Sequence, residues 1–175
     1  GVSANADSNS VVEDANVTGN VLDNDALDPD FNQATTVNSF ILDSNGDGSQ
    51  ESFSAGATTV SITSDGSTVI GSFTLNSDGG YSFTPALNYS GPVPVVTYLM
   101  GSGANTDSAS LTLDITPVSD APGVTSDAAT VNTNEDTAVA LGFNAPTVTD
   151  NTDLNGADAD DNPERLSAIT LSGIP

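Results

Sequence analysis

The fold is decided by three consecutive segments: Val69-Ile70-Gly71-Ser72-Phe73-Thr74-Leu75, Asn76-Ser77-Asp78-Gly79-Gly80 and Tyr81-Ser82-Phe83-Thr84-Pro85. Apolar and hydroxyl side chains alternate in the first and third segments, which is the two-residue period of a half-buried β-strand. Phe73 and Leu75 therefore share one face of the first strand, and Tyr81 and Phe83 share one face of the second. The glycines between the strands supply the positive φ of a tight turn, so we predict a β-hairpin.

The same alternation recurs along the chain, and no stretch shows sustained helical periodicity. In Ser110–Thr116, for example, Leu111, Leu113 and Ile115 alternate with polar residues. Short strands separated by turns rich in Gly, Asn and Asp are typical of a β-sandwich. We therefore predict an all-β fold that forms a β-sandwich. Further strands are expected at Val17–Leu22, Thr36–Leu42, Thr58–Thr63, Val93–Leu99 and Ser110–Thr116.

A domain boundary is expected at Pro117-Val118-Ser119-Asp120-Ala121-Pro122, because its two prolines end the preceding strand. The residues after this boundary partly repeat the beginning of the chain. Val12-Glu13-Asp14 is matched by Asn134-Glu135-Asp136, and Asp28-Pro29-Asp30 is matched by Asp158-Ala159-Asp160. The sequence therefore predicts one complete repeat, residues 1–120, and the opening strands of a second, incomplete repeat, residues 121–175.

The charge of the chain is strongly one-sided. The 175 residues include 24 acidic side chains and a single basic one, Arg165, for a formal net charge of −23. Nucleic-acid binding is excluded, because it needs Lys and Arg to neutralise phosphates. Membrane insertion is not expected either, since no apolar stretch is long enough to span a bilayer and an anionic surface would repel the chain.

Catalysis is not expected. The chain has no His, Lys or Cys that could activate a serine nucleophile. Paired carboxylates could in principle hydrolyse glycosides, but Trp is absent and no aromatic platform for a sugar is evident. Tyr81, Tyr89 and Tyr98 lie in strand patterns and are expected in the core or at its corners.

The acidic residues favour a cation, and Ca²⁺ in particular. Twenty of them are Asp, which is common in turns, and four are Glu. Folding would bring clustered carboxylates together, and a pair about 4 Å apart repels by roughly 4 kcal/mol at an effective dielectric constant near 20. Calcium prefers such oxygen ligands. The alternative is that these aspartates are solvated turn residues that cap backbone N–H groups. The densest predicted sets are Asp23, Asp25, Asp28 and Asp30 in the first repeat and Asp150, Asp153, Asp158 and Asp160 in the second.

Two further positions could hold the same ion. Asp43-Ser44-Asn45-Gly46-Asp47-Gly48 matches the first half of an EF-hand loop, with Asp43, Asn45 and Asp47 as candidate ligands. Position 12 of that loop is Ser54 in place of the usual Glu, so a plain turn between strands is the alternative reading. Asp120 lies in the predicted linker, where an ion could clamp two domains together.

Three motifs occur in order along the chain. They are Asn20-Val21-Leu22-x-Asn24-Asp25 with Asp28-x-Asp30, Asp78-Gly79-Gly80-Tyr81-Ser82-Phe83-Thr84-Pro85 with Asn88-Tyr89-Ser90-Gly91, and Ile115-Thr116-Pro117-Val118-Ser119-Asp120-Ala121-Pro122. Together they resemble the cadherin-like, bacterial immunoglobulin-like tandem repeats of large Gram-negative RTX adhesins, over nearly all of residues 10–175. The resemblance implies that the predicted sandwich is immunoglobulin- or cadherin-like. The turn Leu99-Met100-Gly101-Ser102-Gly103 departs from the family pattern, because it lacks the usual aspartate and so a calcium ligand.

The resemblance implies a secreted protein of the bacterial cell surface, exported by type I secretion and active in adhesion and biofilm formation. It implies that Glu13, Asp14, Glu135 and Asp136 complete the calcium sites. The expected function is a calcium-stabilised extender repeat. Its partners would be calcium ions, neighbouring repeats and, through other domains, a host-cell or biofilm-surface ligand. The alternative is a calcium-dependent lectin- or peptide-binding module, with its site in the insertion between Asp136 and Asp158.

Overall fold

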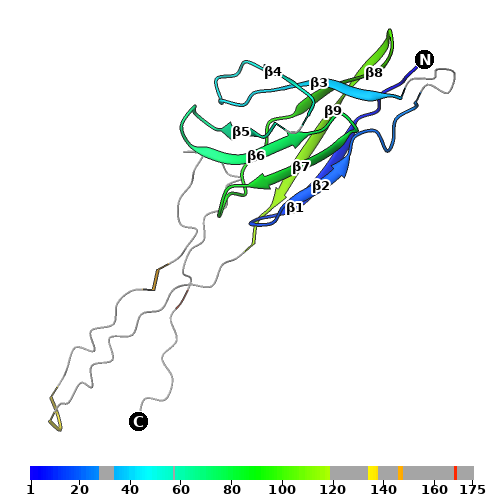
Figure 1. Cartoon of the computed structure of the whole chain (residues 1–175). Coiled ribbons are helices and arrows are strands. Elements are labelled where there is room, and N and C mark those ends of the chain that lie inside the picture. The colour runs from blue at the N-terminus through cyan, green and yellow to red at the C-terminus, as the bar shows by residue number, and fades with distance from the viewer. Residues whose placement is uncertain (28–33, 57, 119–133, 138–145, 148–167, 169–175) are drawn as a thin grey trace. The chain divides into compact units, whose positions relative to one another are not determined.

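A computed structural model describes residues 1–27, 34–56, 58–118, 134–137, 146–147 and 168 (Figure 1). The described residues form nine β-strands and no helix, as the alternating sequence predicts. The strands are β1 Asp7–Val12, β2 Val17–Asn20, β3 Thr36–Leu42, β4 Glu51–Ser54, β5 Val60–Thr63, β6 Val69–Leu75, β7 Gly80–Pro85, β8 Val96–Ser102 and β9 Asn105–Thr116.

The strands form two sheets that pack face to face as a β-sandwich (Figure 1). One sheet has five strands in the order β1-β9-β8-β3-β4, and the other has four in the order β2-β7-β6-β5. β1 pairs with β9 in parallel, and the other neighbours are antiparallel. The orders β2-β7-β6 and β9-β8-β3 reproduce the B-E-D and G-F-C strand orders of immunoglobulin domains. The predicted immunoglobulin-like sandwich is therefore confirmed for the first repeat.

The predicted hairpin is β6–β7. Phe73 lies opposite Phe83, and Leu75 lies opposite Tyr81. All four side chains are buried, as the alternation predicts. The turn closes through hydrogen bonds from Gly79 N to Asn76 O and from Asn76 N to Gly80 O. Gly79 has a φ of 87° there, a conformation that favours glycine.

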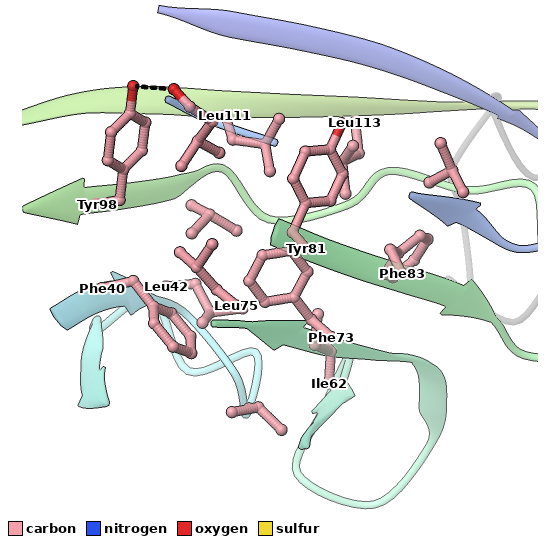
Figure 2. Close-up of a cluster of buried hydrophobic side chains, with 14 of the residues drawn as sticks. Phe40, Leu42, Ile62, Phe73, Leu75, Tyr81, Phe83, Tyr98, Leu111 and Leu113 are labelled. Atoms are coloured by element: carbon pink, nitrogen blue, oxygen red, sulfur yellow. Dashed lines mark hydrogen bonds between the residues drawn. The ribbon is translucent and has the colours of Figure 1, made fainter. Parts of the chain in front are cut away.

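A row of aromatic rings joins the two sheets (Figure 2). Phe40 of β3 stacks on Phe53 of β4 with ring centroids 5.3 Å apart, and it meets Phe73 of β6 edge-on at 5.6 Å. Phe73 then stacks on Tyr81 of β7 at 6.3 Å. Such pairs contribute roughly 0.5–1.5 kcal/mol each beyond the burial of their surface. The row therefore ties β3 and β4 of one sheet to the central strands β6 and β7 of the other.

The predicted strand bounds agree with the observed ones to different extents. The predicted and observed bounds coincide for Thr36–Leu42 and for Val69–Leu75. The strand predicted from Val93 begins only at Val96, because Pro92 and Pro94 have no N–H to donate to a sheet. The strand predicted from Ser110 instead begins at Asn105.

Two strands were not predicted, namely β1 and β4. Their sequences, Asp-Ser-Asn-Ser-Val-Val and Glu-Ser-Phe-Ser, are mostly polar. β1 gains its strand conformation from pairing with β9, and β4 from pairing with β3. Both lie at edges of the five-stranded sheet. Tertiary pairing outweighed local composition at these two positions.

Candidate metal-binding ends of the sandwich

The hydroxyl of Tyr98 lies among oxygen atoms at one end of the sandwich. β8 holds the ring of Tyr98 fully buried in the core, where a dashed line in Figure 2 marks a hydrogen bond of its hydroxyl. Four groups approach this oxygen, and we call them, with Tyr98, the Tyr98 cluster. They are Asn5 O at 3.0 Å, Asp7 Oδ2 at 3.0 Å, Val21 O at 3.1 Å and Asp25 Oδ2 at 3.1 Å.

The Tyr98 cluster has more acceptors than this hydroxyl can satisfy. A phenol has one proton to donate, and all four neighbouring groups accept hydrogen bonds. The pKa of Asp7 is raised to about 6, mainly by burial; the hydrogen bond from Tyr98 opposes this rise, and the nearby carboxylates of Asp25 and Asp23 add to it. Burial also raises the pKa of Tyr98, with Asp7 and Asp25 adding to the effect. The cluster is therefore a concentration of negative charge.

Aspartates at this end also fasten the N-terminal segment. Asn5 N donates to Asp25 Oδ1 at 2.7 Å, and Ala4 N donates to Asp107 Oδ2 at 2.8 Å. Ser3 and Ala26 exchange two backbone hydrogen bonds beside them. The hydrogen bond from Ala4 N, followed by one from Ser108 N at 2.9 Å, lowers the pKa of Asp107. The segment before β1 is thus held by carboxylates from two distant parts of the chain.

The turn between β1 and β2 carries the other predicted acids of the first repeat. Glu13 is buried, and its Oε2 accepts a hydrogen bond from Val118 N at 2.8 Å. Asp14 has a φ of 61°, and its Oδ1 accepts from Asn88 N at 2.8 Å. Glu13 and Asp14 therefore hold this turn against the end of β9 and the loop after β7.

The matched motif in the second predicted repeat forms the same turn. Ala15 N donates to Val12 O at 3.1 Å, and Thr137 N donates to Asn134 O at 3.2 Å. The third residue of each turn is an aspartate with a φ of 61°, Asp14 in one case and Asp136 in the other. Non-glycine residues seldom adopt this left-handed conformation, so the agreement extends from sequence to backbone.

The Asp43–Asp47 loop uses its side-chain oxygens to organise its own backbone. Asp43 accepts from Gly46 N at 2.7 Å and from Gly48 N at 2.9 Å. Asn45 Oδ1 accepts from Asp47 N, and Asp47 Oδ1 accepts from Ser49 N at 2.7 Å. The bond from Ser49 N lowers the pKa of Asp47. These contacts are those of an Asx-rich turn, which is the alternative that the sequence left open.

Among the predicted ligands that the structure describes, hydrogen bonds join Asn45 and Asp47. The side chains of Asp25, Glu13, Asp14 and Asp43 each accept from a backbone N–H group, and Asp23 is exposed. In the described part of the chain, no three acidic side chains lie in an arrangement ready to hold a metal ion. Glu135 and Asp136 are exposed residues of a turn. Seven predicted ligands lie outside the described residues: Asp28, Asp30, Asp120, Asp150, Asp153, Asp158 and Asp160.

Sequence reasoning did not single out Asp7, Asp107, Asn5 or the hydroxyl of Tyr98 as members of a site. Asn5-Ala6-Asp7 has the same alternate spacing of oxygen-bearing side chains as Asp23-Asn24-Asp25, and that signal could have indicated it. The donor chemistry of the Tyr98 cluster, with two carboxylates and two carbonyl oxygens, suits calcium.

Comparisons with known proteins give no further guidance. No protein-family model matches the chain, and no curated protein matches it in sequence. Among the described residues, no helix is long and apolar enough to cross a membrane.

Proposed function

We propose that this chain is a calcium-stabilised extender repeat of a secreted bacterial surface adhesin, which holds a distal ligand-binding region away from the cell. The observation that carries this proposal is the path of the chain through the first repeat. β1 and β9 run parallel, from the end that carries the Tyr98 cluster to the end that carries the Glu13 turn (Figure 1). The chain therefore enters the sandwich at one end and leaves it at the other.

This path suits a tandem array, because each repeat would add its full length to the one before it. The shared turn geometry at Asp14 and Asp136 supports a second repeat of the same kind. The proposed partners within the protein are these neighbouring repeats. The proposed partner of the whole adhesin is a host-cell or biofilm-surface ligand, contacted through other domains.

The carboxylates support calcium as the stabilising ion. Asp7, Asp25 and Asp107 lie at the end where the chain enters, and Glu13 and Asp14 lie where it leaves. End-to-end repeats would bring such groups close together, and a divalent cation would offset their repulsion. An ion that binds only the folded state stabilises it by RT ln(1 + [Ca²⁺]/Kd), or about 1.4 kcal/mol when the concentration is about ten times Kd.

The proposed role is structural rather than catalytic. Tyr81, Tyr89 and Tyr98 are buried side chains of the core, as the sequence predicts. With no His, Lys or Cys in the chain, its serines have no conventional partner that could activate them as nucleophiles.

The test is thermal unfolding in EDTA and in a series of CaCl₂ concentrations, with MgCl₂ as the control ion. We expect calcium to raise Tm and magnesium to raise it less. Asp25→Asn should weaken the calcium response. Asp65→Asn should leave the response intact, because Asp65 lies in an exposed turn and accepts hydrogen bonds from Ser67 N and Thr68 N. A Tm that does not respond to calcium would refute the calcium part of the proposal.

A further inference from the structure

The first and last strands of the described sandwich lie side by side and run in the same direction (Figure 1). All six residues of β1 pair in parallel with Leu111–Thr116 of β9. The chain enters the first repeat through the segment before β1 and leaves it after β9, at the opposite end of the sandwich. A tension applied between these two ends therefore pulls β1 and β9 along their axes in opposite directions.

Hydrogen bonds continue this pairing beyond both ends of β1. At the entry end, the carboxylate of Asp107 in β9 accepts from Ala4 N at 2.8 Å. At the exit end, Glu13 N donates to Thr116 O at 2.9 Å, and Glu13 Oε2 accepts from Val118 N at 2.8 Å. The segment from Ala4 to Glu13 is thus fastened to β9 and its C-terminal extension along its length.

β1 is held to the sandwich mainly by its backbone. Four of its six side chains are polar, and Val11 is the one that is buried. β1 is an edge strand whose one neighbour in the sheet is β9, whereas β9 also pairs with β8. The β1–β9 pairing has six register pairs and the β8–β9 pairing has seven. Under tension between the two ends, the β1–β9 pairing is therefore the contact that yields first.

We propose that the β1–β9 pairing is a mechanical clamp, which lets the first repeat carry tension between its two ends without unfolding. Hydrogen bonds between neighbouring strands run across the strand direction, so tension along the strands loads all of them together. A force that separates two strands at one end instead loads one pair at a time, and the strands open at a lower force. Forced unfolding is governed by the unfolding rate, which the shared load keeps low.

The use of this clamp rests on the proposed extender role, because a spacer between a cell and a distal ligand carries the tension on that attachment. The clamp itself depends on the pairing of β1 with β9 and on no bound ion. Measurement in EDTA therefore separates the two proposals. Loss of the clamp would leave a calcium response of Tm untouched, and an absent calcium response would leave the clamp in place.

The experiment is single-molecule force spectroscopy of the whole chain in EDTA. The sequence has no Cys, so a pair of introduced cysteines gives unique points of attachment. Gly1→Cys with Val118→Cys pulls β1 and β9 in opposite directions and leaves residues 119–175 outside the loaded segment. Val69→Cys with Leu87→Cys, at two exposed positions, pulls apart the open end of the β6–β7 hairpin. We expect the first pair to require a several-fold higher unfolding force than the second.

Proline variants test whether the β1–β9 pairing bears the load. Glu13 N points at β9, and N–H groups alternate in direction along a strand, so Val11 N points at β9 as well. Ser10 N instead donates to Asn9 Oδ1 at 2.9 Å, on the free edge of β1. Val11→Pro should lower the end-to-end unfolding force, whereas Ser10→Pro should leave it nearly unchanged, because an edge strand tolerates proline where its N–H faces outward. Neither variant should change the force that opens the β6–β7 hairpin.

Asp107→Ala keeps the test open if circular dichroism shows that Val11→Pro does not fold. It removes the acceptor of Ala4 N and should lower the end-to-end force. The matched control is Asp65→Ala, which removes acceptors of backbone N–H groups from the turn between β5 and β6 and should leave that force unchanged. Equal unfolding forces for the two cysteine pairs would overturn the proposal. An end-to-end force that neither Val11→Pro nor Asp107→Ala lowers, or that Ser10→Pro lowers as much as Val11→Pro, would overturn it as well.

Discussion

The hydroxyl oxygen of Tyr98 lies 3.0 Å from Oδ2 of Asp7, although 91 positions separate the two residues in the chain. The contact links β8 to the start of β1, two strands that are not neighbours in the sheet, because β9 runs between them. It also places an acidic side chain against the edge of the hydrophobic core. The stability of this end of the sandwich therefore depends on how the hydroxyl and the carboxylate share one proton and on what offsets their charge.

Tyr98→Phe should destabilise the folded protein by roughly 1–3 kcal/mol. The variant keeps the buried ring but removes the one donor that faces Asn5 O, Asp7 and Val21 O. Those acceptors would then remain partly buried without the donor that the Tyr98 hydroxyl supplied. Urea unfolding in EDTA, followed by circular dichroism, measures the change in the free energy of unfolding.

The control for this variant is Tyr89→Phe. Tyr89 is equally buried, and its hydroxyl donates to the neutral carbonyl of Pro92 at 2.7 Å. Losing a bond to a neutral acceptor should cost only about 1 kcal/mol. Equal losses for the two variants would contradict the view that the carboxylates make the Tyr98 cluster distinctive.

Asp7 should make the free energy of unfolding fall as the pH rises from about 4 to about 6. Its pKa is about 6 in the folded state against an ordinary value of 3.8, mainly because the carboxyl is buried. Below the lower value, both states hold the proton. Above the higher value, both have lost it, and the folded state then carries an unfavourable buried charge.

The measurement is the free energy of unfolding across this pH range, in EDTA, for the unmodified chain and for Asp7→Asn. The difference between the two isolates the contribution of Asp7 and should shrink toward low pH. Asp65, whose pKa is lowered to about 2 by hydrogen bonds from Thr68 N and Ser67 N, loses its stabilising charge only at lower pH. A difference that is flat from pH 4 to pH 6 would show that Asp7 titrates normally.

The sequence predicts best those features in which neighbouring residues determine the structure. The alternation around Phe73 and Phe83 places the hairpin and its buried face correctly. Spacing also places Asp43, Asn45 and Asp47 in one loop, although their oxygens bind backbone N–H groups of that loop. Choosing between a turn and a cation site requires knowing where each lone pair points, and composition does not contain that information.

The Tyr98 cluster could not be predicted in the same way, because its members come from three separate parts of the chain. Asn5 and Asp7 precede and begin β1, Val21 follows β2, and Tyr98 lies in β8. Only the order of the strands brings them together. Alternation correctly predicted the ring of Tyr98 to be buried, but it does not say which groups meet the hydroxyl.

Gly46→Ala should destabilise the chain more than Gly48→Ala. Both glycines have positive φ, at 74° and 85°, so each substitution costs roughly 1–2 kcal/mol in backbone strain. A Cβ on Gly46 would also collide with the backbone carbonyl of Ser64, whereas a Cβ on Gly48 would meet nothing within 4 Å. Thermal unfolding of the two variants compares them directly. Equal Tm values would mean that the Asp43–Asp47 loop does not pack closely on the segment at Ser64.

A fragment of residues 1–118 should fold cooperatively on its own. It contains all nine described strands, and the pairing of β1 with β9 joins its first strand to its last. It also keeps Val118, whose N–H binds Glu13. A shorter fragment, residues 14–118, would lose β1, Glu13 and the Asn5 and Asp7 partners of Tyr98, and it should unfold at a much lower urea concentration. If residues 1–118 failed to unfold cooperatively, the predicted boundary near residue 120 would be wrong, and the sandwich would need contacts from the rest of the chain.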